Sequence, residues 1–308
     1  MNPRKDGELA VSVLVLTYNH ARFVRQALES VLAQRLRQPF EIIVSEDCST
    51  DGTREIVQEY AERHPLLVRL FLSERNLHSN EVVARGFRAA RGRYVAPLDG
   101  DDYWTSEDKL QSQVDFLDAR PAFTICFHNA EVVDADSHGT GRVWNGPNQP
   151  QVSGLYELLR GNFIATASVM YRRAAVAELP AWYSDFSITD WPLHLIYARE
   201  GRIGYIDRTL SAYRLHDGGV FSTLDEHEKL EVQADFYSQL RACSSGSLRG
   251  EVARGQRDFF LAWAGEFRRR GDRGMWLRCL HWAWRGGIRH VRPTRPLRRM
   301  AQRVVAWR

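Results

Sequence analysis

The sequence predicts an α/β fold, with a mostly parallel central sheet, helices on both of its faces and a helical extension after it. Three observations support this class. Strand-like and helix-like segments alternate through the first hundred residues, polar clusters follow three of the strands, and a helical, increasingly basic pattern begins near residue 224. An alternating rhythm is typical of parallel sheets, because parallel neighbours need a crossover connection that a helix usually provides.

In the first half of the chain, short apolar runs rich in β-branched residues predict buried strands. These runs cover residues 11–16, 41–45, 68–72 and 94–98. Between them, apolar residues recur with the spacing of amphipathic helices. The helices are expected over Phe23–Leu32, after Gly52 with Ile56, Val57 and Tyr60 on one face, and over Val82–Ala90.

The second half is less regular. It predicts a helix over residues 109–117, strands over 124–127, 167–171 and 203–206, and a Gly-, Pro- and Asn-rich loop over 134–151. From residue 224 onward the chain is predicted to be helical. We therefore expect one domain over residues 1–224, with halves at about 1–110 and 111–224, and an extension over 225–308.

Composition narrows the class of protein. The 308 residues are 44% apolar and 26% charged, which predicts a folded, soluble chain. The four cysteines, at 48, 126, 243 and 279, lack metal-ligand spacing and are predicted to be reduced thiols of a cytoplasmic protein. The apolar run Val11–Leu16 is too short for a signal peptide, and no segment approaches the roughly 20 apolar residues of a membrane span.

The sharpest feature is the run L-D-G-D-D-Y-W at 98–104, which places three carboxylates within four residues. Asp99, Asp101 and Asp102 repel one another unless a cation compensates, and their hard oxygens suit Mg²⁺ or Mn²⁺. Gly100 permits a tight turn that brings the carboxylates toward one centre. Taken alone, the pattern could equally be a solvated acidic turn.

Two more polar clusters, at residues 17–20 and 45–53, also follow predicted strands directly. Parallel sheets bind ligands beyond the carboxyl ends of their strands. We therefore expect these clusters and the carboxylates at 99–102 to face one crevice.

Three stretches together resemble the family 2 inverting glycosyltransferases of GT-A fold. They are V-L-V-L-T-Y-N at 13–19, I-I-V-S-E-D-C-S-T-D-G-T at 42–53 and A-A-R-G-R-Y-V-A-P-L-D-G-D-D at 89–102. The resemblance is dense over about residues 11–110 and weaker to about 220. It implies a transferase that moves one sugar from a nucleotide diphosphate, UDP by expectation, to an acceptor hydroxyl. Residues 1–110 would then hold the nucleotide-sugar and 111–224 the acceptor.

The resemblance also implies roles for individual residues. It assigns nucleotide binding to Thr17, Asn19, Glu46, Asp47, Asp99 and Gly100, and it assigns a divalent cation, Mn²⁺ or Mg²⁺, to Asp101, Asp102 and His216. Asp47 is expected to accept a hydrogen bond from the base, because an ionised carboxylate is an acceptor only and suits the imide N–H of uracil. Asp47 could instead cap the next helix, although Asp51 is better placed for that role.

The transfer also needs a general base that acts on the acceptor hydroxyl. In an inverting transfer a carboxylate takes the proton from the attacking hydroxyl, opposite the leaving group. The run S-I-T-D-W at 187–191 resembles the family's base motif, which makes Asp190 the candidate catalytic residue and Asp185 the second choice. Trp191 is expected to stack on an acceptor sugar. Asp190 could also cap a helix that begins near Pro192, and the two roles are compatible.

Two histidines bear on the resemblance. Ser211–His216 resembles a late motif in which a histidine approaches the metal or the diphosphate, although a lone histidine can be structural. The family often has glycine at the position of His78, two residues after Asn76. This departure leaves nucleotide contacts from Arg75 or Asn76 open.

The C-terminal tail allows three alternatives. Residues 273–308 contain ten arginines and no acidic residue, and tryptophans stand at 263, 276, 282, 284 and 307. Such a segment predicts peripheral attachment to the inner face of the cytoplasmic membrane, where a lipid-linked acceptor would lie. The tryptophans could instead pack on the catalytic domain. A nucleic-acid partner is the least favoured alternative.

Two rival functions are weaker. A sugar-phosphate nucleotidyltransferase should carry a glycine-rich basic loop after the first strand, and Thr17–His20 contains no glycine. A non-catalytic membrane- or nucleic-acid-binding protein would not need three polar clusters at strand ends. The Gln-x-x-Arg-Trp motif of processive polysaccharide synthases is absent, which predicts transfer of one sugar onto a glycan or lipid-linked acceptor in bacterial surface glycan synthesis.

Overall fold

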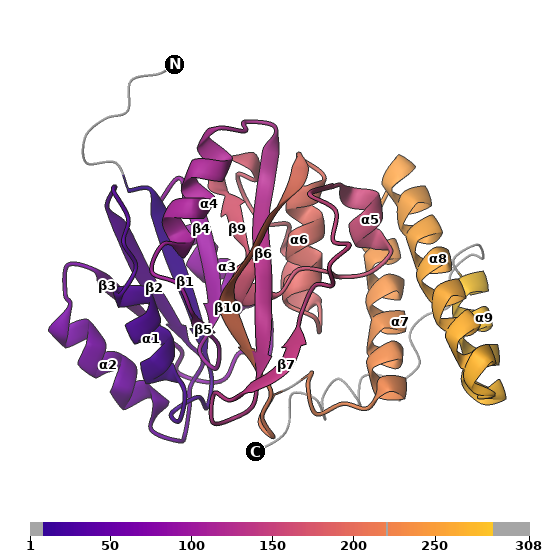
Figure 1. The fold of residues 1–308 in the computed structure, drawn as a ribbon, viewed down its shortest axis with the longest axis horizontal. Coiled ribbons are helices and arrows are strands. Elements are labelled where there is room, and N and C mark those ends of the chain that lie inside the picture. The colour runs from indigo at the N-terminus through magenta and orange to yellow at the C-terminus, as the bar shows by residue number, and fades with distance from the viewer. Residues whose placement is uncertain (1–8, 220, 286–308) are drawn as a thin grey trace. The chain divides into compact units, whose positions relative to one another are not determined.

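The computed structural model describes residues 9–219 and 221–285, which form two compact units. The sheet unit comprises Met1–Gly154, Phe163–Ser184 and Ile196–Leu215. The helical unit comprises Leu155–Asn162, Asp185–Leu195 and His216–Arg308. Figure 1 shows the helices and strands of both units, coloured from indigo at the N-terminal end to yellow at the C-terminal end. Residues 286–308 of the predicted tail, including Trp307, lie outside the described part of the chain.

The described residues of the sheet unit form ten strands in one mixed sheet, in the order β3-β2-β1-β4-β9-β6-β10-β5, with β7 beside β6 and β8 beside β10. Their bounds are β1 Val11–Thr17, β2 Phe40–Glu46, β3 Val68–Leu72, β4 Tyr94–Asp99, β5 Tyr103–Trp104, β6 Phe123–Val133, β7 Gly139–Val143, β8 Val152–Ser153, β9 Met170–Arg172 and β10 Arg202–Arg214. Strands β3, β2, β1 and β4 run parallel, as do β6 and β10, while β9 is antiparallel to both of its neighbours.

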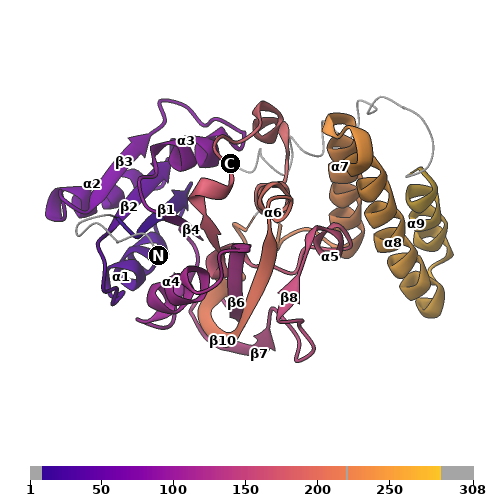
Figure 2. The same cartoon turned by 90° about the horizontal axis from the view of Figure 1, so that it is seen from above.

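The sheet is covered by helices that include α1 Val24–Leu32, α2 Thr53–Arg63, α3 Glu81–Ala89 and α4 Lys109–Asp118. Helices α1, α2 and α4 share one hydrophobic core with alternate residues of β1, including Val13 and Val15. Helix α3 lies on the opposite face (Figure 2), where a Cβ on Gly86 would come within 2.3 Å of Leu14 Cδ1. Three short 3₁₀ segments, Thr166–Ser168, Arg173–Ala175 and Ala181–Asp185, complete the connections.

The predicted fold class is confirmed, and the differences lie in irregular or short strands. Strand β7 falls inside the predicted loop 134–151; all five of its residues are exposed, so it shows no apolar alternation. Strand β10 is far longer than the predicted 203–206, because register shifts around Thr209 interrupt its pattern. The predicted strand 167–171 begins as a 3₁₀ turn and becomes strand only at Met170.

The helical unit contains α5 Leu155–Leu159, the first part of α6 Asp190–Ala198, α7 Glu226–Cys243, α8 Gly246–Arg270 and α9 Arg273–Arg285. Helix α7 begins with a capping box, in which Asp225 accepts from Glu228 N and Glu228 accepts from Asp225 N. The predicted boundary near residue 224 lies just before α7. The helical unit itself starts earlier, at His216, and also includes residues 155–162 and 185–195. None of the described helices has the combined length and apolarity that crossing a bilayer requires.

Candidate functional site at the strand ends of the sheet unit

The sheet register brings three predicted site residues to neighbouring strand ends. Thr17 at the end of β1 is paired with Glu46 of β2, and Leu16 beside it is paired with Asp99 of β4. Two backbone bonds then join the loops that follow: Gly100 N donates to Leu16 O at 2.7 Å, and Asp47 N donates to Thr17 O at 3.0 Å. The polar clusters after β1, β2 and β4 are therefore connected to one another at one edge of the sheet.

The turn after β4 packs tightly on the end of β1. A Cβ on Gly100 would lie 2.8 Å from Thr17 Oγ1 and 2.9 Å from His20 Nδ1, so no other residue fits this position without displacing them. The Thr17 hydroxyl is buried and has no hydrogen-bond partner among the described residues. Asp101 Oδ2 lies 3.5 Å from His20 Nε2. His20 therefore belongs to the site; it lies in the predicted polar cluster 17–20, but no motif assigned it a role of its own.

The three carboxylates of the turn differ in exposure. Asp102 is 2% exposed, and its Oδ1 accepts from Arg214 N at 2.8 Å. The Asp101 side chain is 18% exposed. Burial, together with repulsion from Asp101 and Asp99, holds the pKa of Asp102 well above its usual range. Asp101 is thus the more accessible of these two carboxylates, while Asp102 faces the protein.

This donor set suits a divalent cation. Hard oxygen ligands at a crowded acidic turn match Mg²⁺ or Mn²⁺, and a cation there would lower the cost of keeping Asp102 ionised. Among residues 9–219 and 221–285, no three His, Cys, Asp or Glu side chains are already grouped as a complete metal site. The remaining ligands would therefore come from the bound substrate or from water, as is usual for Mg²⁺ at phosphates.

Arg214, at the end of β10, holds the same turn in place. Its Nε donates to Asp101 O at 2.7 Å while its backbone N binds the Asp102 carboxylate. One terminal nitrogen donates to Ser137 Oγ at 2.9 Å and to Ala135 O at 3.1 Å, and the other donates to Gln26 Oε1 at 2.6 Å. The residue is 3% exposed. Sequence reasoning missed it because only the fold brings β10 beside the turn.

The loop after β2 is held by its own acidic residues. The Glu46 carboxylate is fully buried, accepts from Arg54 Nε at 2.7 Å and also accepts from Ser49 N. The Asp47 carboxylate accepts from Leu77 N at 3.0 Å and from Ser73 Oγ at 2.8 Å. A carboxylate has about four lone-pair sites, so Asp47 retains capacity for a further donor.

Asn19 joins the loops that follow β1 and β2. Its backbone N donates to Ser49 Oγ at 2.9 Å, and its side-chain oxygen accepts from Thr50 N at 2.9 Å. Its φ of 54° is left-handed, a conformation that asparagine tolerates better than most residues. Asp51, rather than Asp47, serves the following helix: its Oδ1 accepts from Thr53 N at 3.0 Å.

The backbone conformation at His78 explains why the family often has glycine at this position. Its φ is 47°, in the left-handed region, where glycine carries no steric penalty. Its backbone N donates to Asn76 Oδ1 at 2.8 Å, which stabilises the turn. The position therefore has the backbone conformation that a glycine would adopt, and histidine accommodates it here.

The candidate base and the late histidine belong to the helical unit. Asp190 begins α6: its Oδ1 accepts from Trp191 N at 2.7 Å, its Oδ2 accepts from Asn162 Nδ2 at 2.7 Å, and its side chain is 27% exposed. Asp190 thus binds the backbone amide of the next residue in its helix and still reaches the surface. His216 Nδ1 accepts from Gly218 N at 3.2 Å, which places the proton of a neutral ring on Nε2.

The expectation for Trp191 is wrong. Its ring is 2% exposed and stacks on Phe236 with centroids 4.5 Å apart, and its Nε1 donates to Leu158 O at 2.9 Å. Tyr237 and Phe259 enclose the same ring. Trp191 is therefore a core residue of the helical unit and cannot stack on a sugar. Its aromatic character signalled packing rather than binding.

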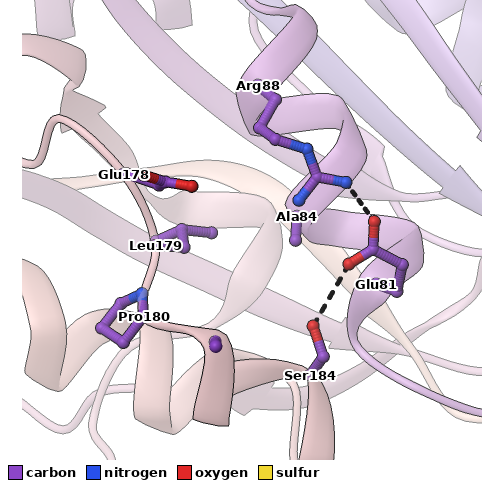
Figure 3. Close-up of a pocket in the computed structure, with 8 residues that line it drawn as sticks. Glu81, Ala84, Arg88, Glu178, Leu179, Pro180 and Ser184 are labelled. Atoms are coloured by element: carbon purple, nitrogen blue, oxygen red, sulfur yellow. Dashed lines mark hydrogen bonds and ion pairs between the residues drawn. The ribbon is translucent and has the colours of Figure 1, made fainter.

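A separate cavity of about 540 Å³ lies between α3 and the segment Glu178–Ser184 (Figure 3). Glu81 and Arg88 lie on the α3 side and bind each other. Glu81 also accepts from Ser184 Oγ of the facing segment at 3.2 Å. Glu178 lies on the opposite wall. None of the predicted site residues lines this cavity, so it is distinct from the strand-end site.

The chain is similar in sequence to proteins of several bacteria. The chain is 37% identical over 212 residues to an uncharacterized protein of Mycobacterium tuberculosis, covering 68% of this chain and 60% of that one. It is 28% identical over 213 residues to a UDP-Glc:alpha-D-GlcNAc-diphosphoundecaprenol beta-1,3-glucosyltransferase of Escherichia coli, covering 68% and 79%. The chain thus spans about 60% of the length of its mycobacterial relative.

Among solved structures, the fold is similar to that of a Pyrobaculum calidifontis mannosyltransferase determined with GDP-Man and Mn²⁺. The TM-score is 0.59 at 18% identity, and the match covers 92% of this chain and 76% of the other. The family model for glycosyl transferase family 2 matches residues 12–179, which include the site residues that follow β1, β2 and β4 but not Arg214. The chain therefore belongs to glycosyl transferase family 2.

Proposed function

We propose that this protein transfers one sugar from a nucleotide diphosphate, UDP, to an acceptor hydroxyl with inversion at the anomeric carbon. The observation that carries the proposal is the turn Asp99–Asp102, which packs through Gly100 against the end of β1 beside Thr17 and His20. In a family 2 chain, this arrangement places carboxylates at the carboxyl ends of parallel strands, where such sheets bind nucleotides.

The strand-end residues divide into contacts and supports. Thr17 offers a hydroxyl that no described residue binds, and Asp47 retains acceptor capacity for the base. Glu46 and Asn19, whose described bonds are to protein groups, act by holding the loops on which Asp47 lies. Asp102 and Arg214 orient the turn, which leaves Asp99 and Asp101 to face the ligand.

A divalent cation held by Asp101 would supply the charge that stabilises the departing diphosphate. Asp102 and His216 are proposed to support or complete this site. The Mn²⁺ in the mannosyltransferase structure is consistent with such a site in proteins of this fold.

Asp190 is proposed as the base. Its carboxylate is partly exposed, and Asn162 and the first turn of α6 fix its orientation. In the reaction, Asp190 would take the proton of the acceptor hydroxyl as the oxygen bonds to the anomeric carbon and the bond to the diphosphate breaks. The Escherichia coli relative is named for a lipid-diphosphate acceptor, which supports a lipid-linked acceptor and a role in bacterial surface glycan synthesis here.

Product analysis tests the proposal against its rival. The protein is incubated with Mn²⁺ and a panel of UDP-sugars together with a lipid-diphosphate-linked N-acetylglucosamine acceptor, and separately with UTP and sugar phosphates. We expect UDP release from at least one UDP-sugar, dependent on acceptor. Pyrophosphate release from UTP and a sugar phosphate, without UDP release, would instead identify a nucleotidyltransferase.

A further inference from the structure

Helix α9 is attached to the helical unit by one side only. Met275, Cys279 and Ala283 are buried, and the Trp282 ring lies 5.2 Å from that of Phe260 on α8. Gln256 of α8 also donates to Trp282 O at 3.0 Å. Part of the tryptophan-rich tail therefore packs on α8, within the predicted extension, and these contacts do not involve the sheet unit.

The other side of α9 is exposed and carries large apolar groups. Arg273, Leu277, His281 and Trp284 are spaced by four, four and three residues, so they lie along one line of the helix. Leu277 is 58% exposed and Trp284 is 74% exposed. We call these four residues the outer face of α9. A tryptophan this exposed, two turns from an exposed leucine, is unusual for a surface without a partner.

The charge of the surrounding sequence indicates what that partner is. Residues 273–308 contain ten arginines and no acidic residue. Arginine is attracted to anionic headgroups, tryptophan favours the headgroup layer, and leucine can enter the boundary of the acyl chains. This combination fits attachment along a membrane surface.

We propose that the outer face of α9 docks on an anionic phospholipid surface. The helix would lie along the surface with Leu277 and Trp284 inserted at headgroup depth and Arg273 beside lipid phosphates. Such docking does not depend on the proposed sugar transfer. If both are correct, docking brings the enzyme to the layer in which a lipid-linked acceptor resides.

Vesicle flotation of the full chain tests the proposal. We expect flotation with vesicles of phosphatidylcholine and phosphatidylglycerol and little with phosphatidylcholine alone. The double variant Leu277→Ser/Trp284→Ser should lower the affinity for anionic vesicles by about ten-fold or more, because it removes the two apolar anchors and no charge. Both side chains are exposed, so the fold should be retained, which circular dichroism would verify.

The matched control is Leu66→Ser, which removes a fully exposed leucine from the sheet unit and should leave flotation unchanged. Absence of flotation in the unaltered chain would overturn the proposal. Equal flotation of the double variant would show that arginine charge alone is responsible and would overturn the role of the outer face. UDP binding should be the same in all these variants, so failure of docking is separable from failure of the proposed catalysis.

Discussion

Asp190→Asn is expected to lower sugar transfer by about 10²- to 10⁴-fold, the usual contribution of a positioned general base. Nucleotide binding should be unchanged, because the strand-end contacts lie on other residues. The replacement is nearly isosteric and keeps an oxygen that can accept from Trp191 N, so α6 should still begin at the same point. Steady-state kinetics and UDP affinity, measured on the same preparation, would separate the two effects.

Two further variants distinguish a base from a helix cap. Asp190→Ser provides a good capping group but no base, so it should retain stability and lose transfer. Asp185→Asn removes the alternative carboxylate and should leave turnover nearly unchanged. Normal turnover of Asp190→Asn would exclude Asp190 from the chemistry, and loss of turnover only in Asp185→Asn would transfer the role to that residue.

Arg214→Lys is expected to weaken cation-dependent UDP binding by about ten-fold and to lower the free energy of unfolding by about 3 kcal/mol. The stability loss follows because a lysine cannot serve the acceptors on Asp101, Ala135 and Gln26 together, and buried acceptors without donors are costly. The binding loss follows because the Asp99–Asp102 turn would no longer be fixed. Denaturant unfolding and UDP titrations with Mn²⁺ would measure the two quantities.

The matched control is Arg172→Lys. Arg172 also anchors several carbonyl groups of the sheet unit, including Phe123 O at 3.0 Å and Leu117 O at 2.7 Å, but these lie away from the acidic turn. It should lose stability while keeping its UDP affinity. If both variants weaken UDP binding equally, Arg214 contributes general stability and is not a positioning residue for the turn.

The parts of the fold that the sequence predicts well are those governed by local pattern. Strands β1, β2 and β4 are buried on both faces and appear as continuous apolar runs. Their strand ends could therefore be assigned, and with them the places of Thr17, Asp47 and Asp99. Strand β7, which is exposed throughout, carries no such pattern.

The parts that could not be predicted depend on contacts distant in sequence. Arg214 meets the acidic turn only after β10 is placed in the sheet, and His20, although it lies in the predicted polar cluster 17–20, carries no local signal of its contact with Asp101. For Trp191 the signal in the sequence was wrong. Its motif predicted stacking on an acceptor sugar, but the aromatic residues of α7 and α8 that enclose it lie at least 45 residues later in the chain. Packing partners of that kind are not visible in a local pattern.

The central claim is that the acidic turn holds a cation against a nucleotide diphosphate. Thermal unfolding with UDP, with and without Mn²⁺, tests it most directly, because a ligand at 100 times its Kd adds about 2.7 kcal/mol of stability. We predict that UDP raises the Tm only with Mn²⁺, that Asp101→Ala abolishes this shift, and that Asp136→Ala, at an exposed aspartate of the same unit, preserves it. An equal shift without the cation, or an undiminished shift in Asp101→Ala, would contradict the account.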